Sequence, residues 1–172
     1  MKLYVSGSPR NKNSFTIIKN LMNINDAYFP LNEMNIQYCK GCIQCQGLSN
    51  GKCRYNDDMT NIYDNIDMFH KIILVSPVYF NNVTAQMKTF IDRLYPFYGT
   101  DKLKNKKIYL VLTGGATEEE NSELIENQTQ YFKEVFSWFD AKFERTIYFK
   151  DGEILSENFI EKIMDIKAKI GV

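Results

Sequence analysis

The alternation of strand-like and helix-like segments constrains the fold of this chain of 172 residues more than any other feature. Lys71 to Ser76 (KIILVS) and Lys107 to Thr113 (KIYLVLT) are almost continuously apolar or β-branched. Such runs are typical of parallel strands that helices cover on both faces. Between them, Ala85 to Tyr95 repeats its apolar residues at helical spacing. The pattern therefore favours an α/β fold.

Five strands are expected to alternate with five helices. The expected strands are Lys2 to Ser6, Tyr28 to Leu31, Lys71 to Ser76, Lys107 to Thr113 and Phe143 to Phe149. The expected helices are Ser14 to Ile24, Asp57 to Phe69, Ala85 to Tyr95, Glu119 to Phe139 and Phe159 to Ile170. This order predicts one domain, residues 1–172, with a doubly wound parallel sheet. One polar segment, Asn35 to Asn56, lacks periodicity and is expected to be an insertion.

Charge and hydropathy exclude several classes of function. Lys plus Arg and Asp plus Glu both number 21, so the net charge argues against nucleic-acid or anionic-membrane partners. No apolar run approaches the roughly 20 residues that span a bilayer. The opening MKLYVSGSPR does not resemble a signal peptide, so we expect a cytoplasmic protein. Thiols stay reduced there, and clustered cysteines then indicate metal binding or redox chemistry.

Three loops are expected to meet at one edge of the sheet. In a doubly wound sheet of order 2-1-3-4-5, ligands bind at the carboxyl ends of strands one, three and four. The first loop, Gly7 to Thr16, enters a helix whose N-terminus suits phosphate. The loop from Ser76 to Val83 holds aromatic and amide side chains that suit a flat heteroaromatic ring. In the third, Thr113 to Ala116, two glycines allow close approach to a ligand.

Each loop also has a simpler interpretation. Ser14 could only cap its helix, the aromatic loop could only pack on the surface, and the glycines could only form a turn. Lys88 and Asp92 are expected to form an ion pair on a helix surface, and Asp57 and Asp58 to cap the next helix. The single histidine, His70, is expected to be structural.

The sequences GSPRNKNSFT, SPVYFNNVTAQMKTFIDRL and TGGA resemble the NADPH-dependent FMN reductase and iron-sulfur flavoprotein group of the flavodoxin-like superfamily. The resemblance covers nearly the whole chain and implies a flavodoxin-like sandwich that binds FMN. It implies that the phosphate is held by Ser8, Arg10, Ser14 and Thr16, beside Phe15, which replaces an Asn often found there. It further implies flavin contacts from Pro77, Val78, Tyr79, Phe80, Asn81, Thr113, Gly114 and Gly115.

The four cysteines, Cys39, Cys42, Cys45 and Cys53, are spaced C-x2-C-x2-C-x7-C. The first three have the spacing of bacterial ferredoxin ligands. The motif also looks like the compact cysteine motif of iron-sulfur flavoproteins, which carry one [4Fe–4S] cluster beside FMN. Four thiolates could instead bind structural zinc, or remain without a metal.

Three functions follow from these features. The first is an FMN-dependent oxidoreductase that uses NAD(P)H, and the second is an electron carrier that accepts electrons from ferredoxin. The third is a zinc-stabilised binding module. The resemblance implies a homodimer or a higher homo-oligomer.

Overall fold

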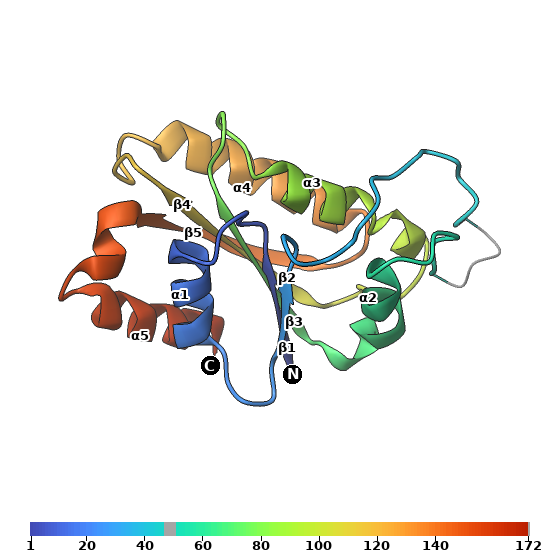
Figure 1. Ribbon diagram of the computed structural model, residues 1–172, viewed down its shortest axis with the longest axis horizontal. Helices are drawn as coiled ribbons and strands as arrows, with labels where there is room; N and C mark the ends of the chain where they lie inside the picture. Colours follow the sequence, from blue (N-terminus) through green and yellow to red (C-terminus); the bar gives the residue numbers. More distant parts are fainter. Residues whose placement is uncertain (47–50, 172) are drawn as a thin grey trace.

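Five parallel strands form one sheet in the order β2-β1-β3-β4-β5. The structure is a computed structural model, and it describes residues 1–46 and 51–171 (Figure 1). The predicted strand order is confirmed. The strands are β1 (Lys2–Ser6), β2 (Ala27–Pro30), β3 (Lys71–Pro77), β4 (Lys107–Gly114) and β5 (Lys142–Lys150).

Helices cover both faces of the sheet, with α1 and α5 on one face and α3 and α4 on the other (Figure 1). They are α1 (Asn13–Leu21), α2 (Met59–Asn65), α3 (Ala85–Asp92), α4 (Ser122–Ser137) and α5 (Phe159–Ile170). Three short 3₁₀ helices follow α2, α3 and β5 at Ile66–Met68, Tyr95–Phe97 and Asp151–Leu155. In the described part of the chain, no helix is both long and apolar enough to cross a membrane.

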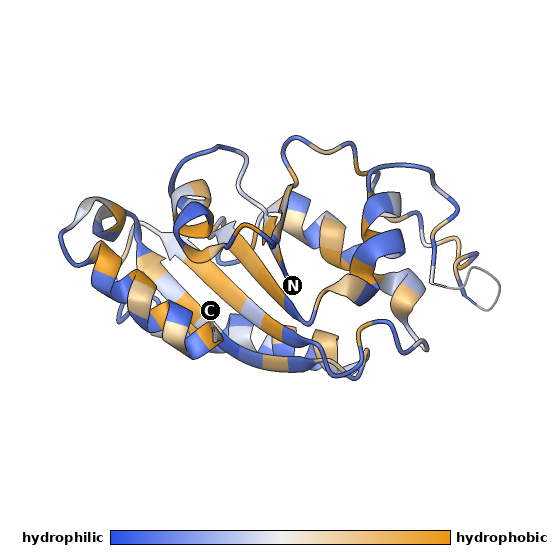
Figure 2. Ribbon diagram, turned by 90° about the horizontal axis from the view of Figure 1, so that it is seen from below, coloured by the Kyte–Doolittle hydropathy of each residue, from blue (hydrophilic) through white to orange (hydrophobic). Residues whose placement is uncertain are grey.

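The central strands explain the continuous apolar runs. β3 pairs with β1 on one side and β4 on the other, and helices cover both of its faces. In β1, Leu3 and Val5 belong to the core under α2, α3 and α4, whereas Tyr4 belongs to the core under α1 and α5. The inner strands are apolar along most of their length, while the helices alternate apolar and polar faces (Figure 2).

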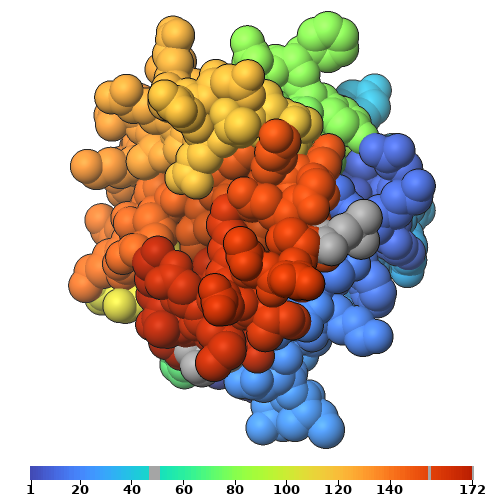
Figure 3. Space-filling model, turned by 90° about the vertical axis from the view of Figure 1, so that its left-hand side faces the viewer, coloured from blue at the N-terminus to red at the C-terminus, as the bar shows by residue number. Residues whose placement is uncertain are grey.

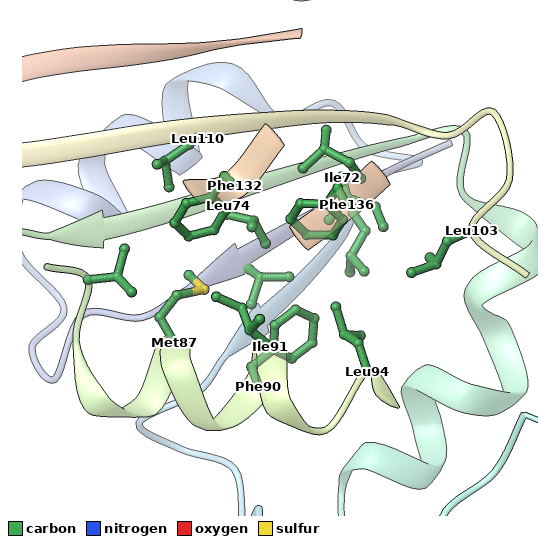
Figure 4. Packing of buried hydrophobic residues seen from close by; sticks show 14 of the residues in the cluster. Ile72, Leu74, Met87, Phe90, Ile91, Leu94, Leu103, Leu110, Phe132 and Phe136 are labelled. Carbon is green, nitrogen blue, oxygen red and sulfur yellow. The ribbon is translucent and has the colours of Figure 1, made fainter. Parts of the chain in front are cut away.

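One core joins the sheet to α3 and α4. Ile72, Leu74 and Leu110 from the sheet converge on Phe90 of α3 and Phe132 of α4 (Figure 4). All five side chains are almost completely buried. Burial of this kind contributes roughly 1.5–3 kcal/mol per large apolar side chain, so this core anchors the helix that follows the β3 loop.

Several helix ends differ from the prediction. α1 ends at Leu21 rather than Ile24, because Met22 is already extended and the next residues turn into β2. α3 ends at Asp92 rather than Tyr95, since the chain continues into the 3₁₀ helix Tyr95–Phe97, which contains Pro96. α4 is shorter than predicted at both ends, whereas α5 has the predicted bounds.

α2 begins at Met59 rather than Asp57. Asp57 and Asp58 were expected to cap this helix, and only Asp57 does so. The Asp57 carboxylate accepts from the Met59 N–H at 3.1 Å, as a cap does. The same carboxylate forms a buried ion pair with Arg93, at 2.6 Å. Asp58, at the N-cap position, caps no helix N–H with its side chain.

Candidate functional site

A cleft lies at the carboxyl ends of β1, β3 and β4, where the sequence predicted a ligand. Side chains or backbone from four loops line it: Ser8, Arg10, Lys12, Asn13, Ser14, Pro77, Val78, Tyr79, Thr113, Gly114, Gly115 and Asp151. Nine of these twelve residues were predicted. The alternation of strands and helices creates this cleft because successive parallel strands end at the same edge.

The N-terminus of α1 opens into the cleft without a side-chain cap. Lys12 occupies the N-cap position and accepts no capping bond, while Ser14 lies inside the first turn and is almost fully buried. The interpretation of Ser14 as an ordinary N-cap is therefore wrong. Helix N–H groups that no side chain caps carry a partial positive charge, and Arg10 and Lys12 add two full charges at the same cleft. The arrangement suits an anion such as a phosphate.

Backbone and hydroxyl contacts fix the first loop against the second. The Gly7 N–H donates to the Val75 carbonyl at 2.8 Å. The Thr84 hydroxyl donates to the Gly7 carbonyl at 2.6 Å and, as the N-cap of α3, accepts from Met87 at 3.3 Å. The Thr84 N–H in turn donates to the Ser76 hydroxyl at 3.1 Å. These bonds hold both loops to α3 and preorganise the cleft.

The aromatic loop is a tight turn. Tyr79 and Asn82 exchange two backbone hydrogen bonds, at 2.8 and 3.1 Å. Phe80 and Asn81 between them have positive φ values of 47° and 60°, the pattern of a type I′ turn. Such a backbone is unusual for a phenylalanine, whose ring is fully exposed here. The loop projects from the surface (green in Figure 3).

The glycine turn after β4 has its own packing reason. A Cβ on Gly114 would lie 2.5 Å from the Tyr148 hydroxyl. That hydroxyl donates to the Ala116 carbonyl and accepts from the Asn121 amide, each at 2.9 Å. Burial raises the pKa of Tyr148, so the phenol stays neutral and supports the turn. Gly115, by contrast, faces open space.

Four predicted site residues lie outside the cleft. Phe15 packs against Tyr28 with ring centroids 6.0 Å apart, and the Thr16 carbonyl accepts from Asn20. Phe80 and Asn81 form the tip of the turn, where the Asn81 carbonyl accepts from Gln128.

Three cleft residues, Lys12, Asn13 and Asp151, were not among the predicted site residues. The Asn13 amide donates to the Asp151 carboxylate at 2.8 Å, across 138 residues of sequence. Asp151 follows β5, whose carboxyl end lies at the same edge of the sheet as the other loops. The loop after strand five could therefore have been included in the prediction.

All four cysteines line a second cavity. Its other walls include Tyr55, Asp92, Arg93, Tyr95 and Pro96, and its volume is about 20 Å³. Four sulfur donors fit both zinc and an iron-sulfur cluster. Among the described residues, no three Cys, His, Asp or Glu side chains are arranged to hold a single metal ion. In a four-iron cluster each thiolate binds a different iron, so the chemistry of the four donors suits a cluster.

The two cavities lie at opposite ends of α3. The cleft includes the loop that precedes α3, and the cysteine cavity includes Asp92 and Arg93 at its other end. Eight residues of helix at 1.5 Å per residue separate these ends by about 12 Å. On the surface of α3, Lys88 and Asp92 form the predicted ion pair, at 2.5 Å.

Comparison with protein families gives a match to the model described as NADPH-dependent FMN reductase, over residues 2–145. The chain belongs to this family. An iron-sulfur flavoprotein from Archaeoglobus fulgidus is 45% identical over 76 residues, which are 44% of this chain and 34% of that protein. One from Methanocaldococcus jannaschii is 33% identical over 100 residues, 54% of this chain and 50% of that protein. The matches thus span between a third and a half of these relatives' length.

Solved structures support the flavodoxin-like fold. A flavodoxin, WrbA-like protein from Agrobacterium tumefaciens has a TM-score of 0.66 at 13% identity, covering 98% of this chain and 93% of its own. General stress protein 14 from Treponema denticola, solved in complex with FMN, has a TM-score of 0.66 at 16% identity and covers 98% of both chains. At these identities the likeness concerns the fold alone.

Proposed function

We propose that this chain is an FMN-dependent oxidoreductase with NAD(P)H as its electron donor. The observation that carries the proposal is the cleft at three strand ends, where an uncapped helix N-terminus meets Arg10 and Lys12. FMN, when bound, supplies hydride and single-electron transfer. The family match and the FMN complex of a neighbour with the same fold also support FMN as the cofactor.

The residues of the cleft divide into two groups by their chemistry. Ser8, Arg10, Lys12 and Ser14 would hold the phosphate through charge, hydroxyl donors and helix N–H groups. Tyr79 and the glycine turn lie at the neighbouring strand ends and would face the ribityl chain and ring. No side chain in this arrangement needs to act as a nucleophile, because the protein's part is to bind and orient the flavin.

The same proposal includes a [4Fe–4S] cluster bound by Cys39, Cys42, Cys45 and Cys53. The four cysteines share one cavity, and the names of the relatives favour a cluster over zinc there. A cluster would allow exchange of single electrons with a protein such as ferredoxin. The chain would then be an electron carrier if it had no small-molecule substrate of its own.

Mass spectrometry of the cofactor released from anaerobically purified protein tests the first part. FMN is the expected product, and FAD alone, or no flavin after reconstitution, would contradict the proposal. Steady-state oxidation of NADPH or NADH with a quinone acceptor separates enzyme from carrier. A carrier would be reduced only by a protein donor.

A further inference from the structure

The cysteine segment is the insertion from Asn35 to Asn56. Hydrogen bonds that have no part in the proposed function join its two ends. We call Asn35, Gln37, Asp57 and Asp58 the neck, because the segment leaves and rejoins the fold there. The Asp58 N–H donates to the Asn35 carbonyl at 3.2 Å, and the Asn35 N–H donates to the Asp58 carboxylate at 2.6 Å. The Gln37 N–H donates to the Asp57 carboxylate at 2.9 Å. The neck thus holds the two ends of the segment side by side.

Arg93, just after α3, binds both sides of the neck. Its two terminal nitrogens donate to the two oxygens of Asp57, at 2.6 and 2.9 Å, and Nη1 also donates to the Gln37 carbonyl at 2.5 Å. The Arg93 and Asp57 side chains are only 1% and 3% exposed. Although burial opposes the charged form, the hydrogen bond from Arg93 lowers the pKa of Asp57. The pair is therefore a buried, bidentate ion pair.

The backbone of Arg93 is anchored as well. The Tyr63 hydroxyl of α2 donates to the Arg93 carbonyl at 2.7 Å. The Tyr55 ring, which belongs to the cysteine segment, lies 5.9 Å from the guanidinium carbon. Three parts of the chain, α2, the end of α3 and the segment, thus meet at this one residue.

One N–H donor of Arg93 has no acceptor among the described residues. It is the Nε–H, whose nitrogen is buried. A buried donor without an acceptor costs roughly 1–3 kcal/mol, so such a group calls for an explanation. Arg93 also lines the cavity that the four cysteines share. A sulfur-rich occupant of that cavity would supply the missing acceptor.

We propose that Arg93 is the positioning residue of the iron-sulfur site, holding both ends of the cysteine segment and donating its Nε–H to a sulfur of the cluster. This rests on the proposed [4Fe–4S] cluster. Four thiolates make such a cluster anionic, and the reduced form carries one more negative charge. Asp57 balances the charge of Arg93, so the effect rests on the N–H donor: a hydrogen bond to a cluster sulfur stabilises the reduced form more, and Arg93 thereby raises the reduction potential.

The test compares reduction potentials and iron content in anaerobically purified protein. Arg93→Met alone would leave Asp57 buried and unpaired, so the main variant is Arg93→Met with Asp57→Asn. Arg93→Lys keeps the charge but loses the bidentate fork and the Nε–H. Lys169→Met is the matched control, because it breaks an exposed i,i+4 ion pair with Asp165 on α5, on the opposite face of the sheet from α3.

The double variant is expected to have a lower midpoint potential and at least a twofold loss of iron per FMN. Arg93→Lys should lie between it and the wild type, and Lys169→Met should match the wild type. If both Arg93 variants had the wild-type midpoint potential and iron content, the inference would be overturned and the cluster would stand. Wild-type protein that holds FMN but no iron after reconstitution would overturn the cluster and the inference together. If the double variant fails to fold, as circular dichroism would show, an unchanged potential in Arg93→Lys is sufficient to refute it.

Discussion

Replacing Arg10 and Ser14 together with Ala is expected to weaken FMN binding at least tenfold. Both residues line the cleft, and Ser14 is almost fully buried beside the uncapped N-terminus of α1. A hydrogen bond to a charged group contributes about 1.5–3 kcal/mol, and about 1.4 kcal/mol is a tenfold change in affinity. Arg10 is exposed, so solvent screening reduces its share. Loss of the hydrogen bond from the buried Ser14 is by itself sufficient for the tenfold loss of FMN affinity.

Fluorescence quenching during titration of the apoprotein with FMN measures this loss. Riboflavin, which lacks the phosphate, should bind the variant as well as it binds the wild type. Lys19→Ala removes a charge from the last turn of the same helix and should leave the FMN affinity unchanged. If the variant bound FMN as tightly as the wild type, or lost riboflavin affinity equally, the phosphate would not lie at α1.

Three other changes test the packing around the site and the sheet. Gly114→Ala should destabilise the protein by about 1–3 kcal/mol in urea unfolding, since its Cβ meets the Tyr148 hydroxyl, and an unchanged midpoint would contradict this. Gly115→Ala is its neutral control. Phe80→Gly should raise the free energy of unfolding by up to about 1 kcal/mol, because glycine adopts the positive φ of this turn without strain. A lower free energy of unfolding in this variant would contradict the explanation. Burial opposes the charged form of Asp26, but hydrogen bonds lower its pKa, so its stabilisation is lost as the pH falls below about 4. Asp26→Asn should therefore flatten the acid limb of the stability curve.

The sequence predicts the order of the elements well, because the residues that each element buries form a pattern within that element's own segment. Lys71 to Ser76 and Lys107 to Thr113 are almost continuously apolar, and both form inner strands with a neighbour on each side. The ends of helices depend instead on contacts that are distant in sequence. Asp57 does not begin α2, since its carboxylate is held by Arg93, 36 residues later.

The candidate site is predictable to the extent that it follows from topology. Ser8, Tyr79 and Gly115 were expected at the cleft because successive strands end at one edge, and they line it. Asp151 was not among the predicted site residues, and its contact with Asn13 joins two ends of the chain that no local pattern connects. The role of Arg93 has the same origin, because the ion pair exists only once α3 packs beside the neck.

The central claim is that one chain holds FMN in the cleft and an iron-sulfur cluster at the cysteines. Flavin, iron and acid-labile sulfide, measured together on one anaerobically purified sample, test it most directly. The account predicts one FMN per chain with about four irons and four sulfides. Protein without FMN after reconstitution would contradict the cleft as a flavin site, and FMN-loaded protein with zinc or no iron would contradict the cluster.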